Sequence, residues 1–460
     1  MLRTRGYRYE LRVNNKERTL LAKCAGISRF AWNWGLAART QRYQTHTEAT
    51  RHTDAMTQHK ELNRLKPTKF PWMYEVSKCI PQEALRDLDR AYQNFFTNLQ
   101  QRKRKQTTRY VGLPKFKKKG KSKDSFRLTG AIRLFPEVNQ VQLPRLGKLR
   151  LKEKPNVPAS ARILNVTVSR TADHWYVALT VKEEQPDPAP NKGPLVALDK
   201  GLSVFVMLSS GILIPRPKFL LRQARKQCRL AKAHSRKENG SKNKQKSALR
   251  LARFYRHITN QRHNFLHQTS TYLAKNHSVI VTEDLNVKGL MENKKLNKYW
   301  ADLSHGMFQR LLTYKASLYG STVIAIGRWF PSSKLCSNCL YYDRDLMLAD
   351  RVFRCPLCGL SLDRDQNAAF NIANYYFIYQ SLIKSVAESS AETLNACGEA
   401  VRLADQQVRV GESGRTAPKS VGFFSPSCLT WVSLSERNMS IAHQKFLFFR
   451  TQSLSFIPFF

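Results

Sequence analysis

Four cysteines in the second half of the chain have the spacing of a metal site. Cys336 and Cys339 are separated by two residues, as are Cys355 and Cys358, and fifteen residues lie between the two pairs. Each C-x-x-C turn lets two thiolates face one ion, and a fifteen-residue hairpin can bring the second turn opposite the first. Two disulfides or four unrelated thiols are the alternatives, but this pattern favours one tetrahedral Zn²⁺ in a zinc ribbon. Because four thiolates leave no open position, we predict a structural rather than a catalytic zinc.

Three acidic residues at the ends of predicted elements form a second candidate site. Asp199 ends the apolar run LVALD, Glu283 ends SVIVTE, and Asp365 precedes apolar residues at helical spacing. Each signal is weak alone, because apolar strands end in any turn residue and a lone Asp365 is typical of a helix N-cap. Neighbouring strands lie about 5 Å apart, so the three carboxylates can share one sheet edge. They would repel one another there unless cations such as Mg²⁺ bridged them.

A carboxylate triad of this kind predicts nuclease chemistry. Two Mg²⁺ ions roughly 4 Å apart activate a water and stabilise the leaving oxygen of a phosphodiester, with carboxylates as ligands rather than as general acid or base. We therefore predict that Asp199, Glu283 and Asp365 are the catalytic residues and magnesium ligands of an enzyme that cuts nucleic acid.

The overall charge points to the same class of partner. The chain carries 78 Lys and Arg residues against 33 Asp and Glu, a formal charge of +45. Such an excess repels itself unless a polyanion neutralises it, and nucleic acid is the usual candidate. A membrane surface is the rival partner. No apolar run reaches eighteen residues and the N-terminus MLRTRGYRYELRV lacks an apolar signal core, so we expect a soluble cytoplasmic protein without membrane binding.

The remaining cysteines agree with a reducing compartment. They are scattered and odd in number, which argues against a secreted disulfide scaffold. They are Cys24, Cys79, Cys228, Cys397 and Cys428.

The basic residues are concentrated in two segments. Residues 102–127 hold twelve Lys or Arg and one acid, and residues 222–262 hold fourteen and one acid. A solvated loop and exposed helices are the ordinary interpretations. However, neither segment has enough acidic residues to neutralise its positive charge, whereas a bound phosphate backbone would neutralise it. The predicted nucleic-acid contacts are Lys115, Lys117, Lys118, Lys119, Arg222, Arg225, Arg229 and Arg253. Residues 391–460 hold seven basic and five acidic residues, so +43 of the charge lies upstream and the tail is not the polyanion site.

The sequence also predicts the order of the helices and strands that must position these residues. Residues 2–13 favour a strand, and helices are predicted around residues 20–34 and 82–101 from their apolar stripes. Short strands follow within 131–183 and indicate a β-barrel or sandwich module. The Pro-rich residues 183–194 mark a domain boundary. After it comes the order strand, strand, strand, helix, strand, helix, strand, helix, which is typical of an α/β layer with a mixed sheet.

Several sequence segments resemble those of a known protein family. ALDKGL, VTEDLNVKGL, FPSSKLCSNC and RCPLCGLSLDRDQNAAFNI resemble the motifs of the TnpB family, the OrfB proteins of bacterial insertion sequences and relatives of type V CRISPR nucleases. WNWGLAART, QEALRDLDRAYQNFF and GLPKFKKKG resemble that family's leading region. The resemblance runs from about residue 5 to about residue 380, and the ribbon followed by DRDxNAA is its most specific part.

The resemblance implies a multidomain α/β protein with a RuvC-like nuclease domain of RNase H fold. It favours Asp365 over Asp363 as the third ligand, because the family's acid immediately precedes x-N-A. The implied domains are 1–14, the first strand of a β-barrel wedge domain; 15–105, a helical recognition lobe; 106–185, the wedge β-barrel with its basic loop; 186–194, a linker; 195–330, the nuclease domain; 331–362, the inserted zinc ribbon; 363–390, the last acid and its helix; and 391–460, a tail outside the family that we expect to be disordered.

The same resemblance implies partners and cofactors. Family members are implied to be transposon-associated, RNA-guided DNA endonucleases, so we expect a guide RNA, a double-stranded DNA target, one structural Zn²⁺ and two catalytic Mg²⁺. A bacterial, nucleoid-associated protein is implied, and a separate transposase encoded by the same element is compatible with this arrangement.

Two other functions are considered. The first is a transposase that joins DNA strands itself, but such enzymes of this element type use a tyrosine beside a His-x-His motif, which this chain lacks. The second is an inactive nucleic-acid-binding protein, and the presence of all three acids argues against it.

The chain departs from the family pattern in two places. Leu340 follows Cys339 where many relatives have Gly, which should preserve zinc binding but alter the turn of the knuckle. Residues after about Phe423, ending FLFFRTQSLSFIPFF, do not resemble family tails, and we assign them no function.

Overall fold

The computed structural model describes residues 2–45, 53–104, 106, 110–347 and 349–378. They lie within a single compact unit, Met1–Leu382. The predicted tail, 391–460, lies outside the described residues, as do Cys397, Cys428 and positions 105 and 107–109 of the first basic segment.

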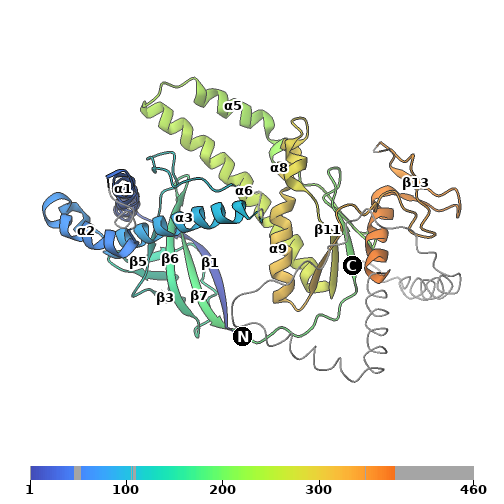
Figure 1. The fold of residues 1–460 in the computed structure, drawn as a ribbon, viewed down its shortest axis with the longest axis horizontal. Helices are drawn as coiled ribbons and strands as arrows, with labels where there is room; N and C mark the ends of the chain where they lie inside the picture. The colour runs from blue at the N-terminus through green and yellow to red at the C-terminus, as the bar shows by residue number, and fades with distance from the viewer. Residues whose placement is uncertain (1, 46–52, 105, 107–109, 348, 379–460) are drawn as a thin grey trace. The chain divides into compact units, whose positions relative to one another are not determined.

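An antiparallel sheet of seven strands forms the first layer (Figure 1). The strands are β1 Leu2–Arg12, β2 Ser125–Leu128, β3 Arg133–Phe135, β4 Gln140–Leu143, β5 Gly147–Leu151, β6 Arg162–Thr171 and β7 His174–Glu184. Their order is β2-β6-β7-β1-β5-β4-β3, so the first strand returns to pair with β7, with Tyr9 opposite Val177. The predicted strand at residues 2–13 and those within 131–183 are confirmed.

The predicted β-barrel is wrong, because this sheet is open. Among the described strands, β2 and β3 stand at the two edges and do not pair with each other. Alternating sequence patterns specify which residues face the core, but the closure of a sheet depends on strand tilt and register over long distances.

Three helices pack against the sheet and each other. They are α1 Asn15–Thr45, α2 Ala55–Lys69 and α3 Cys79–Lys103, with a 3₁₀ turn at Pro71–Glu75. The stripe predicted for the first helix is confirmed at Cys24, Ile27 and Ala31, which are buried. In α3 the first half of the stripe is buried, whereas Phe96 and Leu99 remain 49% and 39% exposed. The sequence pattern therefore identified both helices but overestimated the buried length of α3.

A second sheet of five strands carries the candidate acids. Its strands are β8 Val196–Asp199, β9 Val206–Leu208, β10 Leu213–Ile214, β11 Val279–Glu283 and β12 Thr322–Ile326, in the order β10-β9-β8-β11-β12. The first three strands are antiparallel neighbours, and β11 runs parallel to both β8 and β12. The predicted mixed sheet is confirmed.

Helices cover both faces of this sheet. On one face, Leu198 and Ile280 pack with Leu273 of α6 (Lys242–Asn276) and Phe308 of α9 (His305–Leu318). On the other, Ala197 and Val281 pack with Ile372, which belongs to a helix that begins at residue 364 and continues to residue 378. Burial on both faces explains why these strands are continuous apolar runs rather than alternating ones.

Helices α6 and α9 are joined by a buried ammonium group. Lys315 donates hydrogen bonds to the His267 carbonyl at 2.6 Å, to Thr271 Oγ1 at 2.7 Å and to Ser270 Oγ at 2.9 Å. Burial lowers the pKa of Lys315 to about 8, and three acceptors offset the cost of removing the charge from water.

The remaining helices are α4 Phe219–Arg222, α5 Ala224–Ser235, α7 Val287–Glu292 and α8 Asn297–Leu303. Figure 1 shows α5 and the first half of α6 as a helical hairpin. This hairpin, together with Arg222 at the end of α4, forms the second basic segment.

The predicted linker is packed rather than extended away from the second sheet. A Cβ atom at Gly193 would lie 2.1 Å from the Asn276 carbonyl oxygen, and one at Gly320 would lie 2.0 Å from the Ala189 carbonyl oxygen. The side chain of Asn191 also donates to the Ala274 and Lys275 carbonyls at the end of α6. These close backbone approaches require glycine, and they fix the start of the chain that leads into β8.

Candidate functional site

The four predicted cysteines are brought together by the ribbon. Its strands are β13 Val352–Arg354 and β14 Ser361–Asp363, and Phe353 is buried in a cluster with Cys336 and Cys355. The sulfur atoms lie within 4.8 Å of one another, with Cys336–Cys358 at 3.6 Å and Cys339–Cys355 at 3.4 Å.

These separations distinguish a metal site from disulfides. A disulfide needs an S–S distance of about 2.05 Å, whereas four thiolates about 2.3 Å from one zinc ion are about 3.8 Å apart. Hydrogen bonds from Asn338 and from the backbone of Leu360 lower the pKa of Cys358 to about 6, whereas burial raises the pKa of Cys336 and raises that of Cys339 to about 12. The donor set therefore fits one tetrahedral zinc.

The two cysteine turns have the same backbone conformation. Leu340, directly after Cys339, has φ of 63°, and Gly359, directly after Cys358, has φ of 69°. Each residue donates its N–H to the carbonyl of the first cysteine of its pair, at 3.0 Å. The expectation that Leu340 alters the turn is wrong: the turn is kept, with a leucine in a left-handed conformation that favours glycine.

The structure places two of the predicted acids on adjacent strand ends. Thr282 pairs with Leu198 in the parallel register of β11 and β8, so Glu283 and Asp199 are the next residues along neighbouring strands. Both stand at the carboxyl edge of the sheet. The two apolar runs therefore end side by side, as the sequence predicted.

Electrostatics connects the third acid to the other two. The pKa of Asp199 is raised well above its usual range by burial, and then by the nearby carboxylates of Glu283 and Asp365, while Arg364 acts in the opposite direction. Among the described residues, the four thiols form a group with all ligand atoms within 4.8 Å, and the three carboxylates do not form a second such group. Glu283 and Asp365 are nevertheless close enough to Asp199 to oppose its ionisation, which is the condition that a bound cation would relieve.

Asp363, rather than Asp365, caps the terminal helix. Its carboxylate accepts the backbone N–H of Asp365 at 2.9 Å and that of Gln366 at 3.2 Å. The N-cap interpretation of Asp365 is therefore unnecessary. The Asp365 carboxylate lies 3.9 Å from Nε of Arg364 and raises the pKa of Asp199.

Two further residues touch Glu283 and were missed by sequence reasoning. The ammonium group of Lys200 donates to the Glu283 backbone carbonyl at 2.7 Å, and burial lowers the pKa of Lys200 to about 8. Ser332 Oγ donates to Glu283 Oε1 at 2.7 Å. Lys200 follows Asp199 directly, which is a usable signal, whereas nothing local in the sequence connects Ser332 with Glu283.

The predicted nucleic-acid contacts differ in how they are presented. Lys115, Lys118 and Lys119 are exposed on a loop held to α1, since Asn33 exchanges two hydrogen bonds with the backbone of Lys117. Lys117 itself is half-buried, with its ammonium 3.7 Å from the centre of the Trp32 ring.

The second basic segment divides in the same way. Arg222, Arg225 and Arg229 are exposed, and within the described ranges none of them has a carboxylate within 4.0 Å. Arg253 instead pairs with Asp173 at 2.7 Å, which raises the pKa of its guanidinium. Three of the four predicted arginines are thus available to an external anion.

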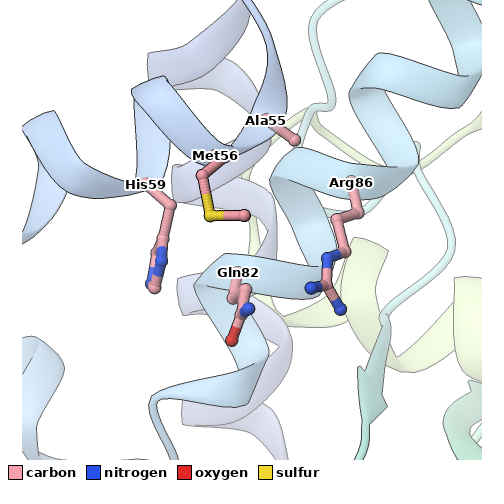
Figure 2. A pocket seen from close by; sticks show the side chains of 5 residues that line it. All are labelled: Ala55, Met56, His59, Gln82 and Arg86. Atoms are coloured by element: carbon pink, nitrogen blue, oxygen red, sulfur yellow. The ribbon is translucent and has the colours of Figure 1, made fainter.

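A small pocket elsewhere has no part in this chemistry. Figure 2 shows it between α2 and α3, where Met56 and His59 face Gln82 and Arg86. Its volume of about 30 Å³ holds about one water molecule, and its lining carries neither the acids nor the ribbon cysteines.

Comparison with protein families gives three matches. A family model described as "Probable transposase" matches residues 178–294, one described as "Helix-turn-helix domain" matches 1–48, and one described as "Cas12f1-like, TNB domain" matches 305–372. Over residues 2–45 the structure has one strand and one long helix. Along the described chain, no helix combines the length and apolar character needed to cross a bilayer.

Similar proteins and structures are also found. A "Putative RNA-guided DNA endonuclease" of Streptomyces pristinaespiralis is 32% identical over 417 residues, covering 89% of this chain and 94% of the relative. "Putative RNA-guided DNA endonuclease InsQ" of Escherichia coli K12 is 28% identical, covering 81% and 92%. A Cas12f1 chain solved with single guide RNA and target DNA is 14% identical with a TM-score of 0.31, covering 81% and 99%.

Proposed function

The chain belongs to the TnpB/OrfB family of insertion-sequence-encoded proteins, and from this premise we propose that it is an RNA-guided DNA endonuclease. The observation that carries the proposal is the placement of Asp199 and Glu283 on neighbouring strand ends, with Asp365 close enough to raise the pKa of Asp199.

The topology of the second sheet supports a RuvC-like nuclease domain of RNase H fold. Three antiparallel strands are followed by two strands parallel to the first, in the order β10-β9-β8-β11-β12. Ligand sites in sheets with parallel strands lie at the carboxyl ends of those strands, which is where the acids stand.

The carboxylates suit magnesium ions as resident cofactors. Hard oxygen donors are what Mg²⁺ prefers, and the mutual repulsion felt by Asp199 favours a cation among the three acids. Two such ions, when bound, polarise the scissile phosphate and activate a water. Lys200 keeps the ends of β8 and β11 together through the Glu283 carbonyl, so that the two carboxylates hold their spacing.

The exposed basic groups grip the phosphate backbone in this proposal. Arg222, Arg225 and Arg229 on α4 and α5, and Lys115, Lys118 and Lys119 on the loop beside α1, face solvent without competing acids in the described part of the chain. Base pairing by the guide then supplies the sequence specificity that these contacts lack.

RNA dependence tests the proposal. The full chain, expressed with the flanking sequence of its own element, should copurify with a discrete RNA that can be sequenced. Replacing the guide segment of that RNA should redirect cleavage to the matching duplex. Cutting that is unchanged after ribonuclease treatment, or that ignores the guide sequence, would refute RNA guidance.

A direct transposase is the second candidate function, favoured by the description of the family model at residues 178–294. A strand-transfer assay with the purified chain and no partner enzyme separates the two, since a nuclease yields cut ends without joined products.

A further inference from the structure

Three asparagines on one face of the terminal helix bind the ribbon. Asn367, Asn371 and Asn374 are four and three residues apart, which places them along one side of the helix that begins at residue 364. Asn367 and Asn371 are almost completely buried. A buried amide is costly unless it is hydrogen-bonded, so its partners show what it holds.

All three asparagines bond to the backbone next to Cys336. Asn367 accepts the N–H of Ser337 at 3.0 Å and donates to the Leu335 carbonyl at 2.6 Å. Asn371 donates to the same Leu335 carbonyl at 2.6 Å, and Asn374 donates to the Ser337 carbonyl at 3.0 Å. The first cysteine turn of the ribbon is therefore fastened on both sides of Cys336 to the helix that carries Asp365.

The same backbone segment reaches the second acid. Asn371 donates to the Ser332 carbonyl at 2.8 Å, and the buried hydroxyl of Ser332 donates to Glu283 Oε1 at 2.7 Å. Residues 332–337 thus contact Glu283 through Ser332, include the predicted zinc ligand Cys336, and are hydrogen-bonded to the helix of Asp365.

We propose that residues 332–337 are a positioning clamp, in which Ser332 orients the Glu283 carboxylate and the zinc-closed ribbon fixes the helix of Asp365 relative to it. The proposal rests on the proposed function, because it assigns the clamp to the metal-binding acids. Asp365 is two residues before Asn367 on the same helix, so a displacement of the ribbon backbone is transmitted to its carboxylate. Neither Ser332 nor the asparagines touches the substrate in this account; they act through the acids.

The matched variants are Ser332→Ala and Ser333→Ala. Ser332→Ala removes the hydroxyl that holds Glu283, whereas Ser333 has no hydrogen bond to that carboxylate. Mn²⁺ binding to the full chain with its RNA is measured by electron paramagnetic resonance, together with zinc content and the Mg²⁺ dependence of single-turnover cleavage. Ligand-supporting groups alter metal affinity by about 10–100-fold.

Ser332→Ala is expected to weaken Mn²⁺ binding about tenfold and to raise the Mg²⁺ requirement by a similar factor, with one zinc and normal RNA content retained. Ser333→Ala should match the wild type, and Ser332→Thr, which keeps the hydroxyl, should recover most of the affinity. Unchanged Mn²⁺ affinity in Ser332→Ala would overturn the clamp.

A second variant tests the link to the ribbon without removing a fully buried side chain. Asn374→Ala loses one hydrogen bond to Ser337 and should release zinc to a chromogenic chelator faster than the wild type, with weaker Mn²⁺ binding in the same preparation. Faster zinc release with wild-type Mn²⁺ affinity would show that the ribbon does not position the acids.

Asp365→Asn separates failure of the clamp from failure of the proposed function. If Asp365→Asn loses Mn²⁺ binding and Ser332→Ala does not, the clamp is wrong and the nuclease site stands. If Asp365→Asn binds Mn²⁺ and cleaves like the wild type, the nuclease assignment itself is wrong.

Discussion

The carboxylate of Asp363 accepts the backbone N–H of Asp365 at 2.9 Å, so two acids separated by one residue have different tasks. Asp363→Ala should lower stability by about 1 kcal/mol through loss of the cap, while Asp363→Asn, which still caps, should not. Both should cleave DNA at near wild-type rates, whereas Asp365→Asn should be inactive. Denaturant unfolding and single-turnover cleavage measure the two effects. Loss of cleavage in folded Asp363→Asn would contradict this division.

Leu340 holds a left-handed backbone that Gly359 holds at the equivalent place in the other turn. Leu340→Gly should therefore stabilise the ribbon, because relief of about 1–2 kcal/mol of steric strain exceeds the entropy cost of about 0.5–1 kcal/mol for glycine. Leu340 is 51% exposed, so little apolar burial is lost. Slower release of zinc to a chelator is the expected observation. Gly359→Leu is the matched reverse change, and equal zinc release in both variants would argue against backbone strain.

Stability should fall in acid because of His305. This side chain is buried, stacks on Phe205 with ring centres 4.9 Å apart, and hydrogen-bonds the Gly201 carbonyl at 3.2 Å. Burial lowers its pKa to about 4. The unfolded chain takes up this proton below about pH 6.5 and the folded chain does not, so about 3 kcal/mol is lost as the pH falls from 6.5 to 4.

Urea unfolding at several pH values measures this loss. Other histidines contribute, so the comparison is between the wild type and His305→Gln, whose stability should depend less on pH in that window. An identical dependence in both proteins would show that His305 is not the group responsible.

Exposed arginines should dominate the salt dependence of RNA binding. Changing Arg222, Arg225 and Arg229 to Gln should reduce the slope of log K against log salt by about 2, since each contact with a single strand contributes about 0.7. Arg253→Gln is the control, because its guanidinium is already paired with Asp173. A slope change in the triple variant no larger than that in the Arg253→Gln control would contradict this assignment.

Local patterns in the sequence predicted much of the fold. The apolar runs ending at Asp199 and Glu283 are strands because both faces of the second sheet are covered, and that burial leaves a continuous signal. The cysteine spacing predicted the ribbon because two short turns encode the site almost completely.

Features that depend on distant partners were not predictable. Whether the first sheet closes depends on its edge strands β2 and β3, and the contact of Ser332 with Glu283 joins residues 49 positions apart. Helix α2 was not predicted as a separate element, because Pro67 lies within it and its apolar stripe is weak. The cap role of Asp363 became clear only from hydrogen bonds.

Divalent-cation-dependent cleavage by the wild type and by Asp199→Ala, each loaded with the same guide RNA, tests the central claim most directly. The account predicts that the wild type cuts the matching duplex with Mg²⁺ and not with a chelator, and that Asp199→Ala keeps its RNA but cuts nothing. Cleavage by Asp199→Ala at a rate near that of the wild type would contradict a site built on Asp199, Glu283 and Asp365.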